Sequence, residues 1–280
     1  MKIHRKIFSG FIAIAFFTIP GFCHSPRYLW LNQYQINQCI TRRIPVPEGY
    51  QRIQIETGSF AAWLRHLPLK KGEPPVYLYN GNKKNNQYAH FTVVDMDVGT
   101  GDLQQCADAI IRLRAEYLYS TNRFQSIRFR FTSGHLAEFW KWIDGFRPRV
   151  NGNSVCWMKS SVFDRSYENF RQYLNTVFMY AGSHSLENEL HRVREITDIK
   201  IGDIFIQGGF PGHAVIVLDM AVHQQNGQKI FLLGQSFMPA QEFHVLKNLE
   251  NSKINPWYSL PFGEILRTPE WDFYQGDLRR

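Results

Sequence analysis

Three short aliphatic runs in the carboxyl-terminal third constrain the fold of this chain more than any other feature. They cover residues 204–206, 213–220 and 229–233. Glycine-containing turn segments, at 208–212 and 224–227, separate them. Short β-branched runs broken by turn residues are typical of strands that pair with their neighbours in sequence. We therefore predict an antiparallel meander in this third of the chain.

Helical signals lie earlier in the sequence. The strongest follows Asp102, where apolar residues recur at helical spacing behind an acidic cap. Cap and spacing signals predict further helices at 59–67, 133–146, 166–181 and 185–193. Strand patterns cover 88–98 and 127–131. The sequence thus predicts an α+β fold in which helices pack on an antiparallel sheet.

The first 25 residues are typical of a secretory signal. Lys2, Arg5 and Lys6 precede an uncharged stretch, 7–19, and small residues follow it. The uncharged stretch is shorter than the roughly 20 residues that a membrane-spanning helix needs. We therefore expect a signal peptide over 1–25 and a periplasmic or secreted protein, with no integral membrane segment after signal removal.

The charge balance of the rest of the chain is mild. The formal net charge of +8 falls to +5 without the signal segment, which holds three basic residues and no acidic one. The remaining charges are scattered along the sequence, so we expect no nucleic-acid partner. A mildly basic exported protein suits a peptide or glycan of the cell envelope as its substrate.

Export also makes the cysteines informative, because thiols tend to pair in an oxidising compartment. Cys39, Cys106 and Cys156 remain after the signal segment. An odd number leaves one thiol over. We expect Cys39 to pair with Cys156, so that Cys106 is the free thiol.

Cys106 lies in the first turns of the helix predicted behind Asp102. At a helix start, the macrodipole and the unpaired amides favour the thiolate, which is the form that attacks a carbonyl carbon. The side chains of Gln104 and Gln105 could bind substrate there by donating to an oxyanion. The alternative is that Cys106 is a small buried hydrophobe on the inner face of the helix.

A thiol nucleophile needs an imidazole to accept its proton, and His213 opens the second of the three predicted strands. Gly212 leaves space beside it. The base in turn needs an orienting partner, and Gln235 ends the next predicted strand. If the meander forms, Gln235 lies close to His213.

Other groups carry weaker signals. Arg112, Arg114 and Glu116 could line a cleft for an anionic ligand, or they could form a solvated helix face with i,i+4 pairs. Histidines gather in the carboxyl-terminal half, at His184, His191, His213, His223 and His244. None has the helical HExxH spacing or a Cys-x-x-Cys partner. We therefore expect no metal site and no cofactor.

Two segments resemble known families. A cysteine at a helix start, a histidine opening a strand after "GDIFI" and a polar residue on the following strand are similar to the papain-like cysteine peptidase superfamily. "GDIFI" and "GHAVIVLD" resemble strands of NlpC/P60 and CHAP amidases, and "QQC" and "HAVIV" resemble transglutaminase-like domains. The resemblance implies that Cys106 is the nucleophile, His213 the base and Gln235 the orienter. Those families usually have Asn, Asp, Glu or a second His where this chain has Gln235.

The resemblance also implies an NlpC/P60-like core over 101–280 and an N-terminal α+β extension over 26–100. Most of the mature chain further resembles a family of exported bacterial proteins that is known only as a domain of unknown function. The phrases that carry this second resemblance are "SFAAWLRHLPLKKG", "DLQQCADAIIRLRAEYLY", "GHAVIVLDMA" and "QSFMPAQEFHVLKN". It implies an envelope or secreted location and no particular activity.

Two functions follow as expectations. The first is an exported thiol-dependent hydrolase or acyltransferase that acts on amide or ester bonds in cell-envelope material through an acyl-enzyme on Cys106. The second is a non-catalytic binding or structural module on the same fold. The second predicts that Cys106 is buried and unreactive and that His213 is bonded elsewhere.

Overall fold

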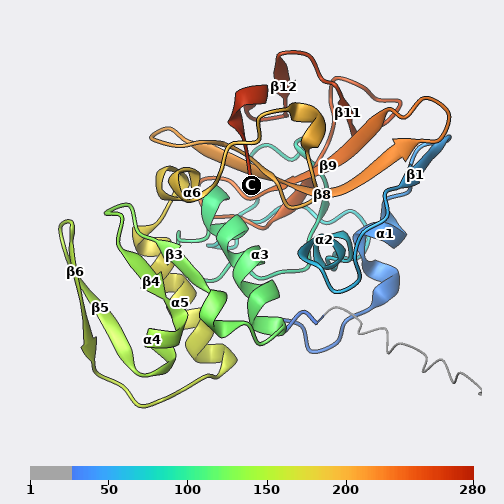
Figure 1. Ribbon diagram of the computed structural model, residues 1–280. Coiled ribbons are helices and arrows are strands. Elements are labelled where there is room, and N and C mark those ends of the chain that lie inside the picture. Colours follow the sequence, from blue (N-terminus) through green and yellow to red (C-terminus); the bar gives the residue numbers. More distant parts are fainter. Residues whose placement is uncertain (1–26) are drawn as a thin grey trace, which may run out of the picture.

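The computed structural model describes residues 27–280 (Figure 1). The predicted signal peptide over 1–25 lies outside the described residues. Within them, no helix combines the length and the hydrophobicity that crossing a bilayer requires. The chain forms a mixed α+β structure in which helices pack against a large antiparallel sheet, as the sequence predicts.

The main sheet has eight strands, and all of its pairings are antiparallel. They are β1 (Tyr50–Arg52), β2 (His90–Val93), β7 (Ile204–Gln207), β8 (His213–His223), β9 (Lys229–Gln235), β10 (His244–Leu246), β11 (Tyr258–Leu260) and β14 (Leu278–Arg279). Their order is β14-β7-β8-β9-β10-β2, with β1 also paired to β8 and β11 to β9. The predicted meander is confirmed as β7, β8 and β9.

Strand β8 is the centre of the structure, and its residues 213–221 are all buried. Helices pack on one face of the sheet, while the short ribbon of β12 (Ile265–Arg267) and β13 (Asp272–Tyr274) lies on the other (Figure 1). A strand covered on both faces needs apolar side chains on both, which explains why β8 reads as a continuous apolar run and not as an alternation.

The helices are α1 (Ile40–Arg43), α2 (Phe60–Arg65), α3 (Cys106–Ser120), α4 (Phe139–Ile143), α5 (Tyr167–Tyr180) and α6 (Ser183–Glu189), with short 3-10 turns at Ile36–Gln38, Phe124–Ser126, Ile196–Asp198 and Gln275–Asp277. Ser59 caps α2 by accepting a hydrogen bond from the Ala62 amide, as predicted. Helix α3 begins at Cys106 and not at Asp102, because the Asp108 carboxylate accepts from the Gln105 amide and fixes the start there. Cys106 is therefore the first residue of its helix.

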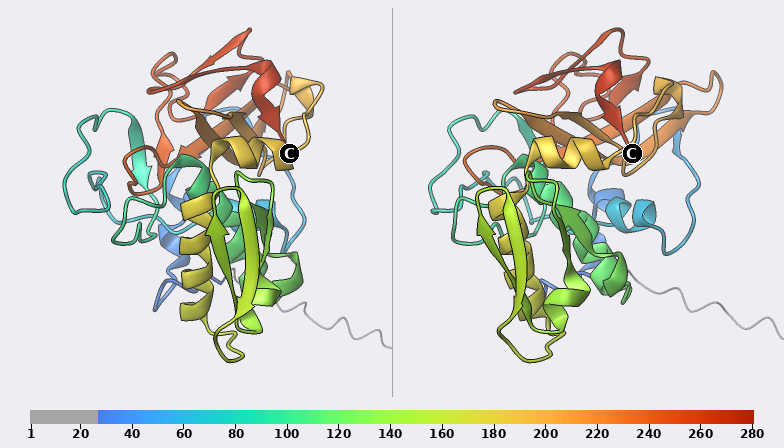
Figure 2. Two further views of the ribbon diagram at one scale, coloured as in Figure 1. Left: turned by 90° about the vertical axis from the view of Figure 1, so that its left-hand side faces the viewer. Right: turned by 60° about the vertical axis from the view of Figure 1, so that its left-hand side comes forward.

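A small lobe, residues 128–180, lies beside α3 and below the main sheet (Figure 2). It contains β3 (Arg128–Arg130) paired with β4 (Leu136–Glu138), helices α4 and α5, and a hairpin of β5 (Phe146–Asn151) and β6 (Ser154–Lys159). The prediction of one helix over 133–146 is wrong. Residues 136–138 instead form β4, which pairs with β3, where Phe129 and the following Phe131 are buried in the core. The helix is therefore confined to five residues, Phe139–Ile143.

The amino-terminal part of the chain contributes to the same sheet as the rest. Strand β1 pairs with β8, and β2 pairs with β10. Arg52 of β1 and Arg65 of α2 both form ion pairs with Asp219, which is completely buried in β8. The division of the chain into a segment over 26–100 and a domain over 101–280 stays a prediction.

Candidate functional site

Cys106 opens α3 at the edge of a pocket. Only 5% of its surface is exposed, yet it lines a cavity of ≈ 640 Å³ together with Gln105, Ser183, Gly212 and Met238. Helix α3 packs against β8 and β9, which carries its first turn toward the start of β8. The pocket thus has a thiol in its wall and the residue before His213 in its lining.

The surroundings of the thiol act on its pKa in opposite directions. Burial raises the pKa of Cys106 to about 11, and the nearby Asp108 acts the same way. Hydrogen bonding to the sulfur from the backbone amides of Ala107 and Ala214 lowers it. The effect of burial on the pKa is larger than that of the backbone, so Cys106 is a neutral thiol near pH 7. Its position at the helix start alone does not produce a thiolate.

His213 is the first residue of β8, where it pairs with Gln207 of β7, and its side chain is fully buried. Three aromatic rings surround the imidazole: the ring centroids of Phe237, Trp271 and Phe273 lie 4.7, 5.4 and 5.9 Å from its own. Burial in this setting lowers the pKa of His213 to about 4, although its hydrogen bond to Gln235 opposes the shift. The ring is therefore neutral at physiological pH.

The structure brings Gln235 to His213. Gln235 ends β9, and its side-chain oxygen Oε1 lies 2.8 Å from His213 Nε2. The amide nitrogen Nε2 of Gln235 donates to the Glu270 carboxylate at 2.8 Å, which fixes which end of the amide faces the ring. Because Oε1 can only accept, His213 must carry its proton on Nε2. Its Nδ1 then has a free lone pair, and it contacts no hydrogen-bond partner within residues 27–280.

Three more residues complete this arrangement. Lys84 forms an ion pair with Glu270 and Asn86 donates to the same carboxylate at 3.2 Å. His244, also fully buried, lies 3.4 Å from Gln235 Nε2 and bonds through Nδ1 to the Glu242 carbonyl at 2.8 Å. Every polar atom of the Gln235 amide is thus occupied. Burial holds the pKa of His244 well below its usual value, so this ring is neutral as well.

The sequence offers no signal for Glu270 or Lys84, which lie far from Gln235 along the chain and in no recognisable motif. Of the two glutamines before the cysteine, the structure brings Gln105 to the pocket and leaves Gln104 out of it. Gln104 is buried, and its side-chain oxygen accepts from Arg112 Nη1 at 2.6 Å.

No hydrogen bond joins the Cys106 sulfur to His213 among the described residues. Ala214, which directly follows His213, acts through its backbone to lower the pKa of the Cys106 thiol. The first turn of α3 thus lies against the start of β8, but His213 does not line the pocket of Cys106, and its imidazole packs against Phe273 of β13.

The expected disulfide between Cys39 and Cys156 is wrong. All three cysteines of residues 27–280 are free. Cys39 is buried next to Thr41, with the sulfur 3.1 Å from the hydroxyl, whereas Cys156 is exposed on the β5–β6 hairpin. The same part of the chain holds no group of three or more His, Cys, Asp or Glu side chains arranged to bind a metal ion.

Comparison with known proteins identifies the family. The model of a domain of unknown function, number 4846, matches residues 40–280. The chain belongs to this family. The match covers all six helices described above and the complete main sheet, and it carries no activity with it. Neither the search of curated proteins nor that of solved structures found a match.

Proposed function

We propose that this protein is a thiol-dependent hydrolase or acyltransferase in which Cys106 is the nucleophile, His213 the general base and Gln235 the residue that orients the base. The observation that carries the proposal is the state of the imidazole. Its Nε2 is held by Gln235, its Nδ1 is buried and unpartnered, and the backbone of the next residue, Ala214, acts to lower the pKa of the Cys106 thiol. A ring fixed at one nitrogen and unpartnered at the other can accept a proton, and the proposal requires that the Cys106 sulfur reaches this second nitrogen.

The reaction follows from these groups. The thiol proton passes to Nδ1 of His213 as the sulfur attacks the carbonyl carbon of an amide or ester, which gives a tetrahedral oxyanion. The oxyanion collapses to a thioester on Cys106, and His213 returns the proton to the departing amine or alcohol. Water or a second nucleophile then releases the acyl group. Because both groups rest in their neutral forms, proton transfer accompanies attack and does not precede it.

The order of these elements supports a papain-like identity for the core. A cysteine opens a helix, a histidine opens the strand packed against that helix, and the orienting residue ends the next antiparallel strand. The amino-terminal signal pattern supports export, and amide or ester bonds of cell-envelope peptides or glycans are the substrates that location offers. The pocket beside Cys106 is large enough for such a segment.

One observation favours the second candidate, a non-catalytic module. Cys106 is only 5% exposed and burial raises its pKa to about 11, which is the behaviour of a structural cysteine. The two candidates differ in how the reactivity of the thiol depends on pH. A passive thiol reacts as its thiolate fraction grows, whereas a thiol served by a general base reacts once that base is neutral.

The experiment measures the rate at which a thiol-directed acyl probe modifies Cys106 between pH 3 and pH 9. We expect the rate to rise as the proton leaves His213, near pH 4, and to stay level above pH 5. Cys106→Ala should abolish modification at this site, and His213→Asn should slow it by about 10²-fold or more. Cys156→Ala is the matched control, because it removes the exposed thiol and should leave the Cys106 rate unchanged.

The proposal fails if the Cys106 rate increases tenfold with each pH unit up to pH 9, or if His213→Asn reacts as fast as the wild type. Either result would establish the non-catalytic module, provided that peptide mapping locates the label on Cys106.

A further inference from the structure

A second pocket lies along α3, one turn beyond Cys106. It has a volume of ≈ 390 Å³, and none of its lining residues belongs to the set that surrounds the thiol. Helix α6 contributes to both pockets, with Ser183 in the first and Leu186 in the second. The second pocket is therefore a separate site that shares two helices with the first.

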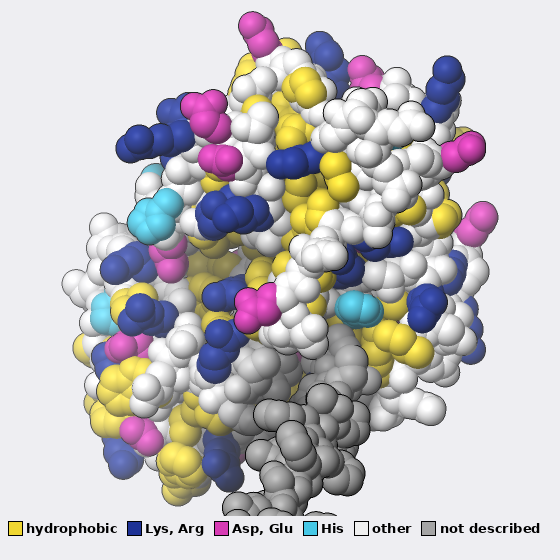
Figure 3. Space-filling model, turned by 45° about the vertical axis from the view of Figure 1, so that its right-hand side comes forward, with side chains coloured by type: hydrophobic (Ala, Val, Ile, Leu, Met, Phe, Trp, Pro, Cys, Tyr) yellow, Lys and Arg dark blue, Asp and Glu magenta, His cyan; other side chains and the backbone are white. Residues whose placement is uncertain are grey.

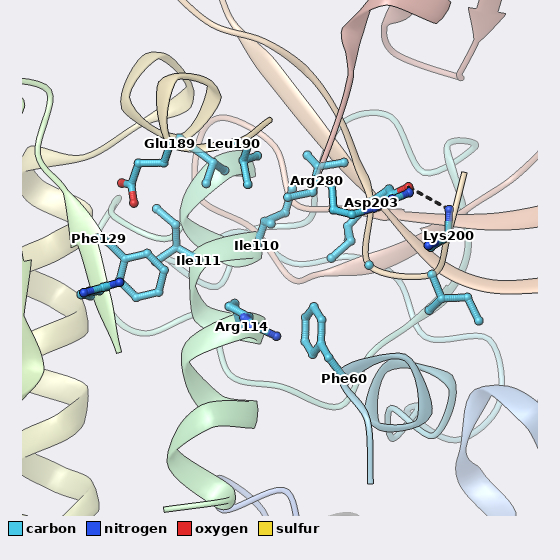
Figure 4. Close-up of a pocket in the computed structure, with 16 residues that line it drawn as sticks. Phe60, Ile110, Ile111, Arg114, Phe129, Glu189, Leu190, Lys200, Asp203 and Arg280 are labelled. Carbon is cyan, nitrogen blue, oxygen red and sulfur yellow. Dashed lines mark hydrogen bonds and ion pairs between the residues drawn. The ribbon is translucent and has the colours of Figure 1, made fainter. Parts of the chain in front are cut away.

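The interior of this pocket is apolar. Its lining includes Phe60, Ile110, Ile111, Phe129, Leu186 and Ile216. Figure 4 shows Phe60 and Phe129 on opposite sides of α3, with Ile110 and Ile111 projecting between them. Such walls favour an aliphatic chain, because each methylene group moved out of water into an apolar pocket strengthens binding.

The edge of the pocket is basic. Four cationic residues line it, Arg114, Arg128, Lys200 and Arg280, against two carboxylates. Arg280 is already paired with Asp203 through two contacts of 2.7 Å. Within residues 27–280, the side chains of the other three cations form no hydrogen bond and no ion pair.

The second carboxylate offsets them only in part. Glu189 accepts a hydrogen bond from the Arg130 backbone amide and forms no ion pair within residues 27–280, although the charges of Arg130 and Arg128 oppose the rise in its pKa that burial causes. In Figure 4 its carboxylate lies at the far left of the pocket, away from Arg114 and Lys200. A hollow of this character, hydrophobic inside and flanked by Lys and Arg side chains, is visible on the face of the molecule in Figure 3.

We propose that this pocket binds a single-chain amphiphile with an aliphatic tail and an anionic head group. The tail occupies the apolar interior, and the head group lies at the edge, where Arg114, Arg128 and Lys200 supply positive charge in excess of the two carboxylates. A carboxylate and a phosphate share this chemistry. Neither the site nor its ligand depends on the reactivity of Cys106, so the proposed function and this inference stand or fall separately.

The test uses four probes with the same twelve-carbon tail: dodecanoate, dodecyl phosphate, dodecan-1-ol and dodecyltrimethylammonium. Binding to the full mature chain is measured by calorimetry below the concentration at which each probe forms micelles. We expect an anion to bind at least tenfold more tightly than the alcohol, and the cation to bind more weakly than the alcohol. The stronger of dodecanoate and dodecyl phosphate identifies the head group.

Arg128→Glu is the deciding variant, because this exposed side chain forms no hydrogen bond or ion pair within residues 27–280. Glu138 lies opposite it on β4, so circular dichroism first establishes that the variant is folded. We expect it to weaken binding of the stronger anion by about tenfold or more and to leave the alcohol unchanged. Arg149→Glu, an equal charge reversal at an exposed position on β5, is the matched control and should have no effect.

Three results would overturn the inference. They are equal affinity for anion and alcohol, equal loss in the two charge-reversal variants, and no binding of either anion by a protein whose circular dichroism shows it to be folded. Leu186→Trp, which fills the pocket from α6, provides a second measurement. Unchanged anion affinity in that variant would place the ligand elsewhere.

Discussion

The first turn of α3 and its middle face two pockets that differ in how they handle charge. Around Cys106 and His213, polar groups are buried, the Gln235 amide is bonded at both ends, and burial favours the neutral forms of the thiol and the imidazole. Around Ile110 and Arg114, the walls are apolar, and three of the four exposed cations at the edge form no ion pair within residues 27–280. The first region therefore keeps its titratable groups neutral, whereas the second presents positive charge to solution.

This difference predicts different sensitivities. Neutral substitutions and changes of pH between 4 and 7 should act on the first region, because its groups titrate and its hydrogen bonds define one tautomer. Charge reversal and salt should act on the second, because Arg and Lys stay charged over that range and their attraction for an anion is screened.

The largest effect is expected at Arg112, which supports both regions. Its guanidinium is completely buried on α3 and contacts Glu116 at 3.3 Å, Asp97 at 2.6 Å and Gln104 at 2.6 Å. Arg112→Ala leaves the buried Glu116 carboxylate without its cation, so the free energy of unfolding should fall by about 3–5 kcal/mol. Urea denaturation measures this free energy of unfolding. Arg128→Ala, which removes an unpaired exposed cation, should change it by less than about 0.5 kcal/mol.

A comparable loss for the two substitutions would mean that the Arg112 contacts contribute little to holding α3. Probe modification of Cys106 and binding of the amphiphile should both be lost in Arg112→Ala, since both pockets depend on the same helix.

The second prediction is a pH dependence of stability. His213 has a pKa of about 4 in the folded protein, below the ordinary value of about 6.5 that an unfolded chain restores. The unfolded state therefore binds the extra proton as the pH falls below about 6.5. The stability that His213 contributes is present above that pH and is lost down to about pH 4, by up to about 3 kcal/mol. His244 shifts in the same direction.

Unfolding free energies at pH 7, 6, 5 and 4 check this prediction, and His213→Asn should flatten the profile. Amphiphile binding provides the contrast and should vary little between pH 7 and pH 6. A stability that stays constant from pH 7 to pH 4 would show that the imidazoles are not held neutral by burial.

The part of the site that lies on the meander could be predicted from sequence. Antiparallel neighbours with short turns leave little freedom of register, so the pattern of β7 to β9 was enough to place Gln235 beside His213. Glu270 and Lys84 could not be found in this way. They reach the Gln235 amide from distant segments, and only the tertiary fold brings a carboxylate to it.

The Arg112, Arg114 and Glu116 group shows a second limit. Sequence left open whether these residues line an anion-binding cleft or form a solvated helix face. The structure divides them, because Arg112 and Glu116 are buried against each other while Arg114 lines the second pocket. The spacing of residues in the sequence predicts which face of the helix each of them occupies. Whether that face is buried depends on the strands that pack against it, and the sequence does not show these. For the same reason the segment 133–146 was misjudged, since pairing of β4 with β3 overrode its local preference.

A third prediction concerns the tautomer of His213. In Glu270→Gln, the new amide can donate as well as accept, so the Gln235 amide is free to turn and present its NH₂ group to the ring. Nitrogen NMR should then show a share of His213 protonated on Nδ1, where the wild type carries its proton on Nε2. We expect a loss of stability of about 1–3 kcal/mol as well, because Lys84 loses its buried partner.

The matched control for this variant is Glu187→Gln, which removes a carboxylate paired with Arg279 at a partly exposed position. It should leave the tautomer unchanged and cost less than about 1 kcal/mol. If Glu270→Gln retains a pure Nε2 tautomer, the Glu270 contact is not what orients Gln235.

The smallest effect is expected in the small lobe, which touches α3 but supplies none of the polar groups around His213. Ser166 caps α5, and its hydroxyl accepts a hydrogen bond from the Asn169 amide at 3.2 Å. Ser166→Ala should therefore lower the free energy of unfolding by about 1 kcal/mol, while Ser166→Asp should restore most of it. The rate of Cys106 modification should be the same in all three proteins, because the first turn of α3 is fixed by Asp108 and by β8. A change in that rate larger than about twofold would show that the lobe positions α3, and the two regions compared above would then respond as one.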